Sequence, residues 1–396
     1  MTLKDTKITT IQNARCAQEH NEEANLVWEA FNAGLPIRPP VHLGTTTQYF
    51  IFNDDLNPGE RVSFEAYSTD AETMLSFQLR SQAWRGEKIA PYCDDQVGVP
   101  KEFVVKVDLQ NFDEAAYFGA PIMFMSHQVP DTVPIYEGDR KWAFMDQGLP
   151  DPLKGGWYEQ AHQLYEQMSA LVDAAPTYME KPIRKGPFGI WTGGILTLAV
   201  ALRGQALLMD LYEDPDYVRA FFNYLVEGTI QRIQSHLAFF DLPVPADEMF
   251  FADDAIQMIS TAMLKEFLVP AYQTLKNNLT SADQVKIHLC GDATRHFRVL
   301  KENLGVNEFE TGFPVDFGWL RRELGPDVLI HGGPSVVLLR DGTPDEVRSE
   351  THRILHSGIC DGGRFVLREG NNLAPGTPFE NLAAMYEEAR RYRCPE

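Results

Sequence analysis

The segments EMFFAD at 248–253 and VKIHLC at 285–290 decide the fold, because each is a short apolar run that ends in polar residues. A helix is expected between them, over about 262–278. A strand, a helix and a second strand form a βα unit, which is typical of a parallel sheet. The sequence therefore predicts that the two segments are neighbouring parallel strands.

The alternation continues to the end of the chain. Three more strands are expected, with the sequences VNEFE at 306–310, VLIHG at 328–332 and RFVLRE at 364–369. Helices are expected near 295–304, 344–356 and 378–391. Two of these helices begin with an N-cap threonine, a proline and a capping-box glutamate: Thr343-Pro344 with Glu346, and Thr377-Pro378 with Glu380.

Upstream of these units the pattern is helical. Helices are expected over Trp157–Ala174, over Gly194–Tyr212, and from the Asp214-Pro215 cap to about Phe240. Residues 1–150 are rich in proline, aspartate and aromatic residues and show no long helical period. The predicted architecture is an α/β fold, a (β/α)8 TIM-like barrel over 151–396, preceded by a partly irregular N-terminal α/β extension over 1–150.

The bulk composition limits the partners. The 396 residues carry a formal net charge of -21, which repels phosphate backbones and anionic membrane surfaces. No apolar stretch approaches the roughly 20 residues of a spanning helix, and the N-terminus lacks an apolar signal core. The five cysteines are an odd number and widely spread, so reduced thiols are expected. We expect a cytoplasmic protein that binds neither nucleic acid nor membrane; a homo-oligomer stays open.

Polar residues gather where each expected strand gives way to its loop. They are Asp253 and Asp254, His288 and Cys290, Glu308 and Glu310, His331, and Glu369 with Asn371. In an α/β barrel these strand ends converge on the active-site face. Asp253, Asp254, Glu310 and His331 are the candidate catalytic residues, although a solvated loop or a hydrogen-bonded barrel rim would also account for Glu310 and His331.

The sharpest motif is IHLCGD at 287–292. His288 and Cys290 are two residues apart at a strand end, so both side chains point to the same side and can reach one metal ion, and this pair of ligands suits zinc. A buried histidine beside a buried cysteine is the alternative. Glu369 is the favoured third ligand because it follows a strand on the same face, and Asp253 or Asp254 could also complete the site.

Two other residues are weaker metal ligands. Asn371 follows the same strand as Glu369 and offers only an amide oxygen. Cys360 comes before the strand RFVLRE, which places it at the opposite face of the barrel.

Several segments together resemble the uroporphyrinogen decarboxylase superfamily. They are GPF at 186–188, LRGQALLMDLYEDPDYV at 202–218, ADD at 252–254, IHLCGD at 287–292, IHGG at 330–333, GTPDEV at 342–347 and LAPGTPFENLAAMYEEARRY at 373–392. The resemblance implies a barrel with its chemistry at the strand ends. An RQAGR-type segment, which true uroporphyrinogen decarboxylases use for a substrate with many carboxylates, is missing here.

The motif at His288 and Cys290 is closest to the zinc-dependent corrinoid (methylcobamide) methyltransferases of this superfamily. That resemblance implies zinc, a corrinoid carried by a partner protein, and transfer of a methyl group to or from a small molecule; no residue is assigned to the corrinoid. Asn371 stands where some of these enzymes have a further cysteine. Two alternatives stay open: a metal-free decarboxylase or lyase that uses Asp254, and a non-catalytic corrinoid- or tetrapyrrole-binding protein.

Overall fold

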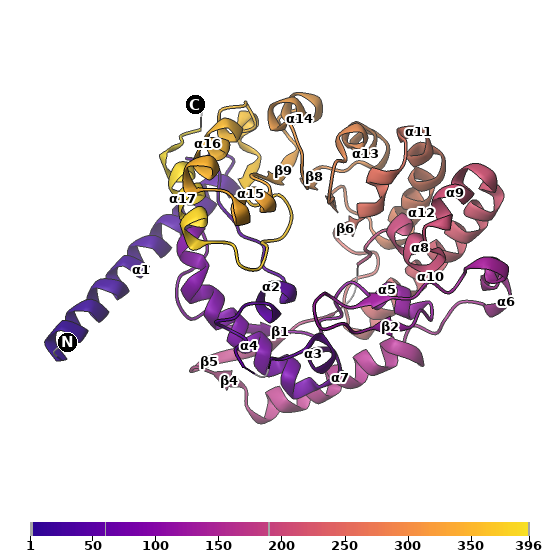
Figure 1. Ribbon diagram of the computed structural model, residues 1–396, viewed down its shortest axis with the longest axis horizontal. Coiled ribbons are helices and arrows are strands. Elements are labelled where there is room, and N and C mark those ends of the chain that lie inside the picture. Colours follow the sequence, from indigo (N-terminus) through magenta and orange to yellow (C-terminus); the bar gives the residue numbers. More distant parts are fainter. Residues whose placement is uncertain (1–2, 60, 189–190, 395–396) are drawn as a thin grey trace.

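A computed structural model describes residues 3–59, 61–188 and 191–394 of the chain. Five parallel strands form its central sheet (Figure 1). In the order in which they pair, they are β10 (Phe365–Leu367), β9 (Leu329–Gly332), β8 (Glu308–Glu310), β7 (Val285–His288) and β6 (Met249–Ala252). The parallel pairing expected of EMFFAD and VKIHLC is therefore confirmed, with Phe251 opposite Ile287.

Three further segments complete the barrel wall, which then has eight strand segments. Val41 forms a parallel bridge with Leu367 at the β10 edge, and Thr192 forms one with Phe251 at the β6 edge. Between them in sequence, β1 (Phe103–Val105) pairs in parallel with β5 (Lys181–Lys185), the segment that leads to Thr192. The chain is a (β/α)8 barrel, as its alternating pattern predicted.

Side chains of α4 (Ala71–Lys88) connect the segment at Val41 with β1. Arg85 donates to the Leu43 carbonyl at 2.8 Å, and the Gln82 amide bonds both the backbone N–H and the carbonyl of Val104, at 3.1 and 2.9 Å. These backbone groups would bond a neighbouring strand in a regular sheet. The helix thus provides hydrogen-bond partners for backbone groups of the two segments, which do not bond each other within the described residues.

Helices surround the strands as a ring (Figure 1). The main ones are α7 (Gly156–Ala174), α8 (Ile195–Arg203), α9 (Ala206–Glu213), α10 (Pro215–Phe239), α12 (Val269–Leu279), α13 (Phe297–Leu304), α14 (Phe317–Leu324), α16 (Pro344–Leu355) and α17 (Phe379–Arg391). The core lies between them and the strand residues that alternate outward, such as Val285, Ile287 and Phe309, each at most 1% exposed. On β7 and β8 the inward positions carry polar side chains, namely Lys286, His288, Glu308 and Glu310.

Helix boundaries confirm some predictions and correct others. Asp214 caps α10, and Thr343 with Glu346 forms the predicted capping box of α16. Thr377 is not an N-cap, because its hydroxyl bonds the Ala374 carbonyl and α17 begins after Pro378. The single helix predicted over 194–212 is wrong: the backbone of Gly204 adopts φ +75°, a left-handed conformation that ends α8, and α9 leaves at 109° to it.

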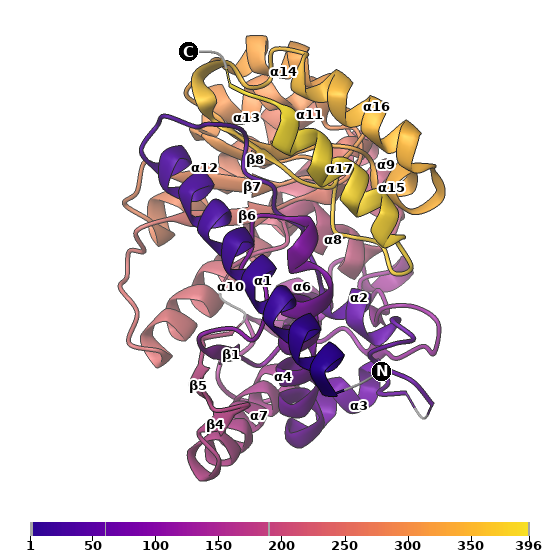
Figure 2. The same ribbon diagram turned by 90° about the vertical axis from the view of Figure 1, so that its left-hand side faces the viewer.

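The expectation of no long helix in residues 1–150 is also wrong. Helix α1 (Leu3–Asn32) has 30 residues and projects from the body, as Figures 1 and 2 show. Its contact side buries Ala24, Val27 and Phe31, near its C-terminal end. Over residues 15–32, whose side chains the structure describes, the helix buries these three and therefore needs few apolar positions, which explains the weak period there. The division of the chain at residue 150 stays a prediction.

Among the described residues, no single helix is long and apolar enough to cross a membrane. The bent pair α8 and α9 meets that test of length and composition only when its two helices are taken together.

A buried ion pair fixes the start of the barrel to its last helix. Both terminal nitrogens of Arg38 lie 2.7 Å from the Asp94 carboxylate. The same carboxylate accepts from the Val41 backbone at 2.7 Å and from the Tyr386 hydroxyl of α17 at 2.9 Å. Arg38 and Asp94 are each 2% exposed.

Replacing Asp94 with alanine should therefore destabilise the whole barrel, because the buried Arg38 guanidinium loses the carboxylate that contacts both of its terminal nitrogens and keeps a longer ion pair, with Glu23 at 3.3 Å. We expect Asp94→Ala to lower the free energy of unfolding by about 3–5 kcal/mol in equilibrium urea unfolding. Arg61→Ala is the control, since Arg61 pairs with Asp54 at the surface and should change stability by less than about 1 kcal/mol. Equal effects of the two variants would contradict this role for Asp94.

Candidate metal centre and active-site cavity

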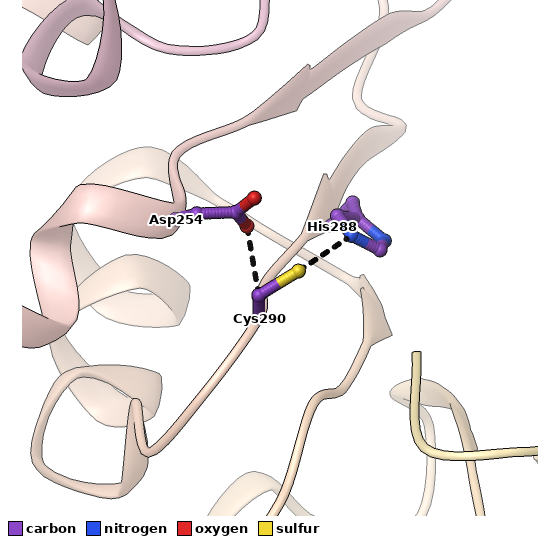
Figure 3. Close-up of side chains that lie close together, drawn as sticks. All are labelled: Asp254, His288 and Cys290. Atoms are coloured by element: carbon purple, nitrogen blue, oxygen red, sulfur yellow. Dashed lines mark hydrogen bonds between the residues drawn. The ribbon is translucent and has the colours of Figure 1, made fainter. Parts of the chain in front are cut away.

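Three potential metal ligands meet at the carboxyl ends of β6 and β7 (Figure 3). His288 Nε2 lies 3.3 Å from Cys290 Sγ, and Asp254 Oδ1 accepts from the Cys290 backbone at 2.8 Å. The ligand atoms of the three residues all lie within 4.8 Å of one another. In a tetrahedral zinc site a thiolate and an imidazole nitrogen are about 3.5 Å apart, so this arrangement needs little change to take the ion.

The second ring nitrogen of His288 contacts a carboxylate. Its Nδ1 lies 2.9 Å from Glu310 Oε1, and the same oxygen lies 2.7 Å from Arg368 Nη1. Burial raises the pKa of Glu310, but His288 and Arg368 outweigh it and hold the pKa at about 2. An ionised Glu310 keeps the proton of a neutral imidazole on Nδ1, so Nε2 is free to bind a metal.

Burial lowers the pKa of the unliganded His288, whereas Cys290 and Glu310 raise it, with a net rise to about 10. Burial raises the pKa of the Cys290 thiol, although the contact with His288 opposes that rise. Neither group is thus in its metal-binding form by itself near neutral pH. A cation would have to displace a proton from this pair, so metal binding should strengthen as pH rises.

Close backbone packing fixes the loop that carries Cys290. A Cβ atom at Gly312, just after β8, would lie 2.5 Å from the Gly291 nitrogen and 2.8 Å from the Cys290 carbonyl carbon. Both are backbone atoms, so only glycine fits at this position.

Glu369 is not the third ligand that the sequence predicted. Its fully buried carboxylate accepts from Arg368 at 2.6 Å and from the Gly44 backbone at 3.0 Å. Burial raises its pKa to about 7 in spite of Arg368. Asp254, which was predicted as another residue that could complete the site, is the carboxylate beside His288 and Cys290.

Asp253 has a structural environment although it adjoins Asp254. Its carboxylate accepts from the backbone N–H groups of Leu196 and Thr197, each at 3.0 Å, and from the hydroxyl of Tyr272 at 2.5 Å. The Thr197 hydroxyl is a further donor, at 2.8 Å. The residue is fully buried and caps the start of α8, so its oxygens are occupied.

His331 is beside Glu310 in the strand pairing, but its side chain contacts Glu308, two residues earlier on β8. Strand pairing sets Lys286 beside Glu308, and His288 beside Glu310. His331 Nε2 lies 3.1 Å from Glu308 Oε1, and Lys286 Nζ lies 3.5 Å from Glu308 Oε2. Among the described residues, those that line the cavity do not include His331. The structure therefore does not bring the predicted catalytic His331 to the metal ligands.

The two weaker ligand candidates lie in different places. Asn371 lines the cavity, with its backbone in the left-handed region at φ +98°. Cys360 is buried next to Cys394, and this thiol contact, together with burial, raises its pKa above the usual range. Cys360 is absent from the described cavity lining.

A cavity of about 830 Å³ opens above the metal ligands. Its lining includes residues that the sequence analysis did not single out as site residues, notably Asp113, Glu114, Trp191, Phe250 and Arg340. Asp113 and Glu114 follow the strand β1, so the logic that located the other strand ends applies to them as well. They were missed because FVVKV at 103–107 was not assigned as a strand.

Comparison with known proteins gives one family. A family model described as uroporphyrinogen decarboxylase (URO-D) matches residues 158–392, more than half of the chain. The methylcobamide:CoM methyltransferase MtbA of Methanosarcina mazei is 22% identical over 203 residues, and that of Methanosarcina acetivorans is 21% identical over 203 residues. Each alignment covers 50% of this chain and 57% of the relative, so the chain spans just over half the length of these curated relatives.

A solved structure of a methyltransferase from Methanosarcina mazei has a TM-score of 0.61 with 18% identity. The superposition covers 91% of this chain and 96% of that one. At this identity the likeness concerns the fold, and it agrees with the barrel described above.

The adjacent aspartates should respond differently to substitution. Asp253→Ala leaves four donors unsatisfied and should lower the free energy of unfolding by at least about 3 kcal/mol, whereas Asp254→Ala loses one hydrogen bond and should cost about 1 kcal/mol. Urea unfolding of chelator-treated protein measures both. If Asp254→Ala proved the more destabilising, the structural role given to Asp253 would be wrong.

Proposed function

The chain belongs to the uroporphyrinogen decarboxylase family, and on that premise we propose that it is a zinc-dependent methyltransferase. It moves a methyl group between a small molecule and a corrinoid carried by a partner protein. The observation that carries this proposal is the convergence of Asp254, His288 and Cys290 beneath a cavity at the strand ends. A cytoplasmic location is part of the same proposal.

The donor set suits zinc. One thiolate, one imidazole and one carboxylate are all accepted zinc ligands, and three protein ligands are typical of catalytic sites, which keep a fourth position for substrate. A bound zinc ion supplies Lewis-acid polarisation of the heteroatom that gives up or receives the methyl group. Glu310 orients His288 for this role, and Arg368 holds Glu310 in place.

The number of thiolate ligands affects which class of methyl donor the site favours. Sites with several thiolates leave zinc less electrophilic, whereas Asp254 in place of a second sulfur makes the site harder. A harder site favours polarisation of an ether, amine or carboxyl-type methyl donor over delivery of a thiolate. The small molecule that we propose is therefore a methylated oxygen or nitrogen compound, and it differs from the thiol coenzyme M in the names of the curated relatives.

The cavity is consistent with a partner that brings the corrinoid. At about 830 Å³ it accommodates a small molecule, while a corrinoid ring has to lie across its opening. Trp191 and Phe250 supply aromatic surface in the lining. The partner protein would dock over the carboxyl ends of the strands.

The charge of the lining argues against a polycarboxylate substrate. Asp113, Glu114, Asp254 and Glu310 line the cavity, against Arg340 and His288 as cationic groups. Glu114 and Glu310 are already paired with Arg232 and Arg368, so the cationic groups of the described lining, Arg340 and His288, are too few to pair with eight carboxylates. The metal-free decarboxylase alternative therefore gains no support from the cavity.

Metal content distinguishes the proposed ligands from the others. The purified protein should hold about one zinc ion per chain, and Cys290→Ala or Asp254→Ala should lose it because a catalytic site has only three protein ligands. Cys360→Ala and Glu369→Gln are the controls and should keep the metal. Elemental analysis by mass spectrometry measures this. Zinc that survives Cys290→Ala, or that disappears with Cys360→Ala, would contradict the assignment.

Methyl transfer can be tested with free cobalamin as the probe. Cob(I)alamin with methyl ethers or methylamines, and methylcob(III)alamin with demethylated acceptors, should change absorbance when the zinc-loaded protein is added. Cys290→Ala should slow this at least about a hundredfold, because Lewis-acid stabilisation contributes several kcal/mol. No spectral change with the zinc-loaded wild type in either direction would count against the proposed function.

A further inference from the structure

An acidic pair lies across the cavity from the metal ligands. Asp113 and Glu114 begin helix α5 (Asp113–Tyr117) and line the same cavity as Asp254, His288 and Cys290. Two adjacent carboxyl groups in one cavity would repel each other if both were ionised. What each one contacts decides which of the two keeps a proton.

Glu114 is held as an anion. Its Oε1 lies 2.5 Å from Arg232 Nη2, and its Oε2 accepts from the Gly193 backbone at 2.6 Å and from the Thr192 hydroxyl at 3.2 Å. Both oxygens therefore have donors, and a buried guanidinium balances the charge. Glu114 links the loop that carries Thr192 to α5 and has no oxygen left for a substrate.

The Asp113 carboxyl group is oriented by a hydroxyl, and the nearby Arg232 reaches it through that hydroxyl. Its Oδ2 accepts from the Tyr158 hydroxyl at 2.8 Å, and that hydroxyl accepts from Arg232 Nη1 at 3.1 Å. Within the described residues Oδ1 has no side-chain hydrogen-bond partner, and Asp113 lines the cavity. The chain from Arg232 through Tyr158 fixes the carboxyl group and leaves one oxygen for a ligand.

The charged and titratable groups around Asp113 come from three helices. They are Glu114 on α5, Tyr158 on α7 and Arg232 on α10. Burial and the charge of Glu114 raise the pKa of Asp113, while Arg232 and Tyr158 lower it, and the net direction is upward. A fixed anion beside a carboxyl group that holds its proton to higher pH is the arrangement from which enzymes make an acid–base residue.

Methyl transfer needs such a residue. A donor R–X–CH3, one proton and Co(I) give R–XH and CH3–Co(III): the X–C bond breaks, the electron pair of Co(I) forms the Co–C bond, and the proton goes to X. The reverse reaction releases that proton. Zinc polarises X but supplies no proton.

The geometry points to Asp113 as the catalytic acid of this transfer, giving its proton to the heteroatom X as the methyl group leaves and taking it back in the reverse direction. This inference rests on the proposed function, because it assigns the proton of that reaction. Tyr158 is its positioning residue.

The first test does not depend on turnover. Infrared difference spectra of the zinc-loaded protein, recorded while the pH is raised from acid to alkaline, should contain the carbonyl band of a protonated carboxyl group that ionises near neutrality. The buried Glu369 also ionises near neutrality, so Glu369→Gln is recorded beside Asp113→Asn to separate the two contributions. The Asp113 component should be missing from Asp113→Asn and present in Glu369→Gln. It should also persist in Asp173→Asn, the control, because Asp173 is an exposed carboxylate on the same helix as Tyr158.

The second test follows the reaction with free cob(I)alamin and a methyl ether. Asp113→Asn should keep its zinc and slow the transfer by about 10²–10⁴-fold, and the fall in rate that the wild type shows as Asp113 loses its proton at higher pH should disappear. Tyr158→Phe keeps the ring and removes only the orienting hydroxyl, so it should lose part of the transfer rate. This variant provides the test if Asp113→Asn does not fold.

The outcomes separate this inference from the proposed function. Titrating carbonyl bands that are the same in the wild type and in Asp113→Asn, or an Asp113→Asn protein as fast as the wild type, would overturn the role of Asp113. A wild-type protein that transfers no methyl group but loses the Asp113 component with Asp113→Asn would refute the methyltransferase and still support Asp113 as the proton-holding carboxyl of the cavity.

Discussion

The Glu310 carboxylate connects the parts of the site. One of its oxygens contacts His288 on β7 and Arg368 beyond β10, and Arg368 in turn binds Glu369, which accepts from the backbone of Gly44 in the first barrel segment. This series of contacts ties four segments of the barrel together on the side where the strands end. Glu310 also orients the His288 ring toward Cys290. The ligand geometry therefore depends on the buried ion pairs that Arg368 makes with Glu310 and Glu369.

Much of the site followed from the sequence, because alternation along a strand decides which residues face inward. His288 and Cys290 were located from their spacing, and Asp254 from its place after EMFFAD. Glu369 was predicted as a ligand because it comes at the end of the strand at 364–369, on the same face of the barrel as His288 and Cys290. Strand pairing sets Val366 beside His331, so Arg368 shares the inward face while Glu369 points the other way. The register, which the sequence does not contain, was needed to tell them apart.

The N-terminal third was the least predictable part. Its strands are short, and α4 provides side-chain hydrogen bonds where a neighbouring strand would otherwise pair, so no clear alternation marks them. Helix α1 buries few side chains over residues 15–32, the part whose burial the structure describes, and this segment shows little apolar period. The acidic pair at 113–114 was missed with the strand that precedes it, although both residues line the cavity.

The central claim is that a single thiolate, from Cys290, shares one zinc ion with His288 and a carboxylate. X-ray absorption at the zinc edge of the purified protein tests it most directly. The account predicts one sulfur at about 2.3 Å, with the remaining nitrogen and oxygen ligands at about 2.0–2.2 Å. Two or more sulfur ligands, or a zinc ion without sulfur, would contradict it.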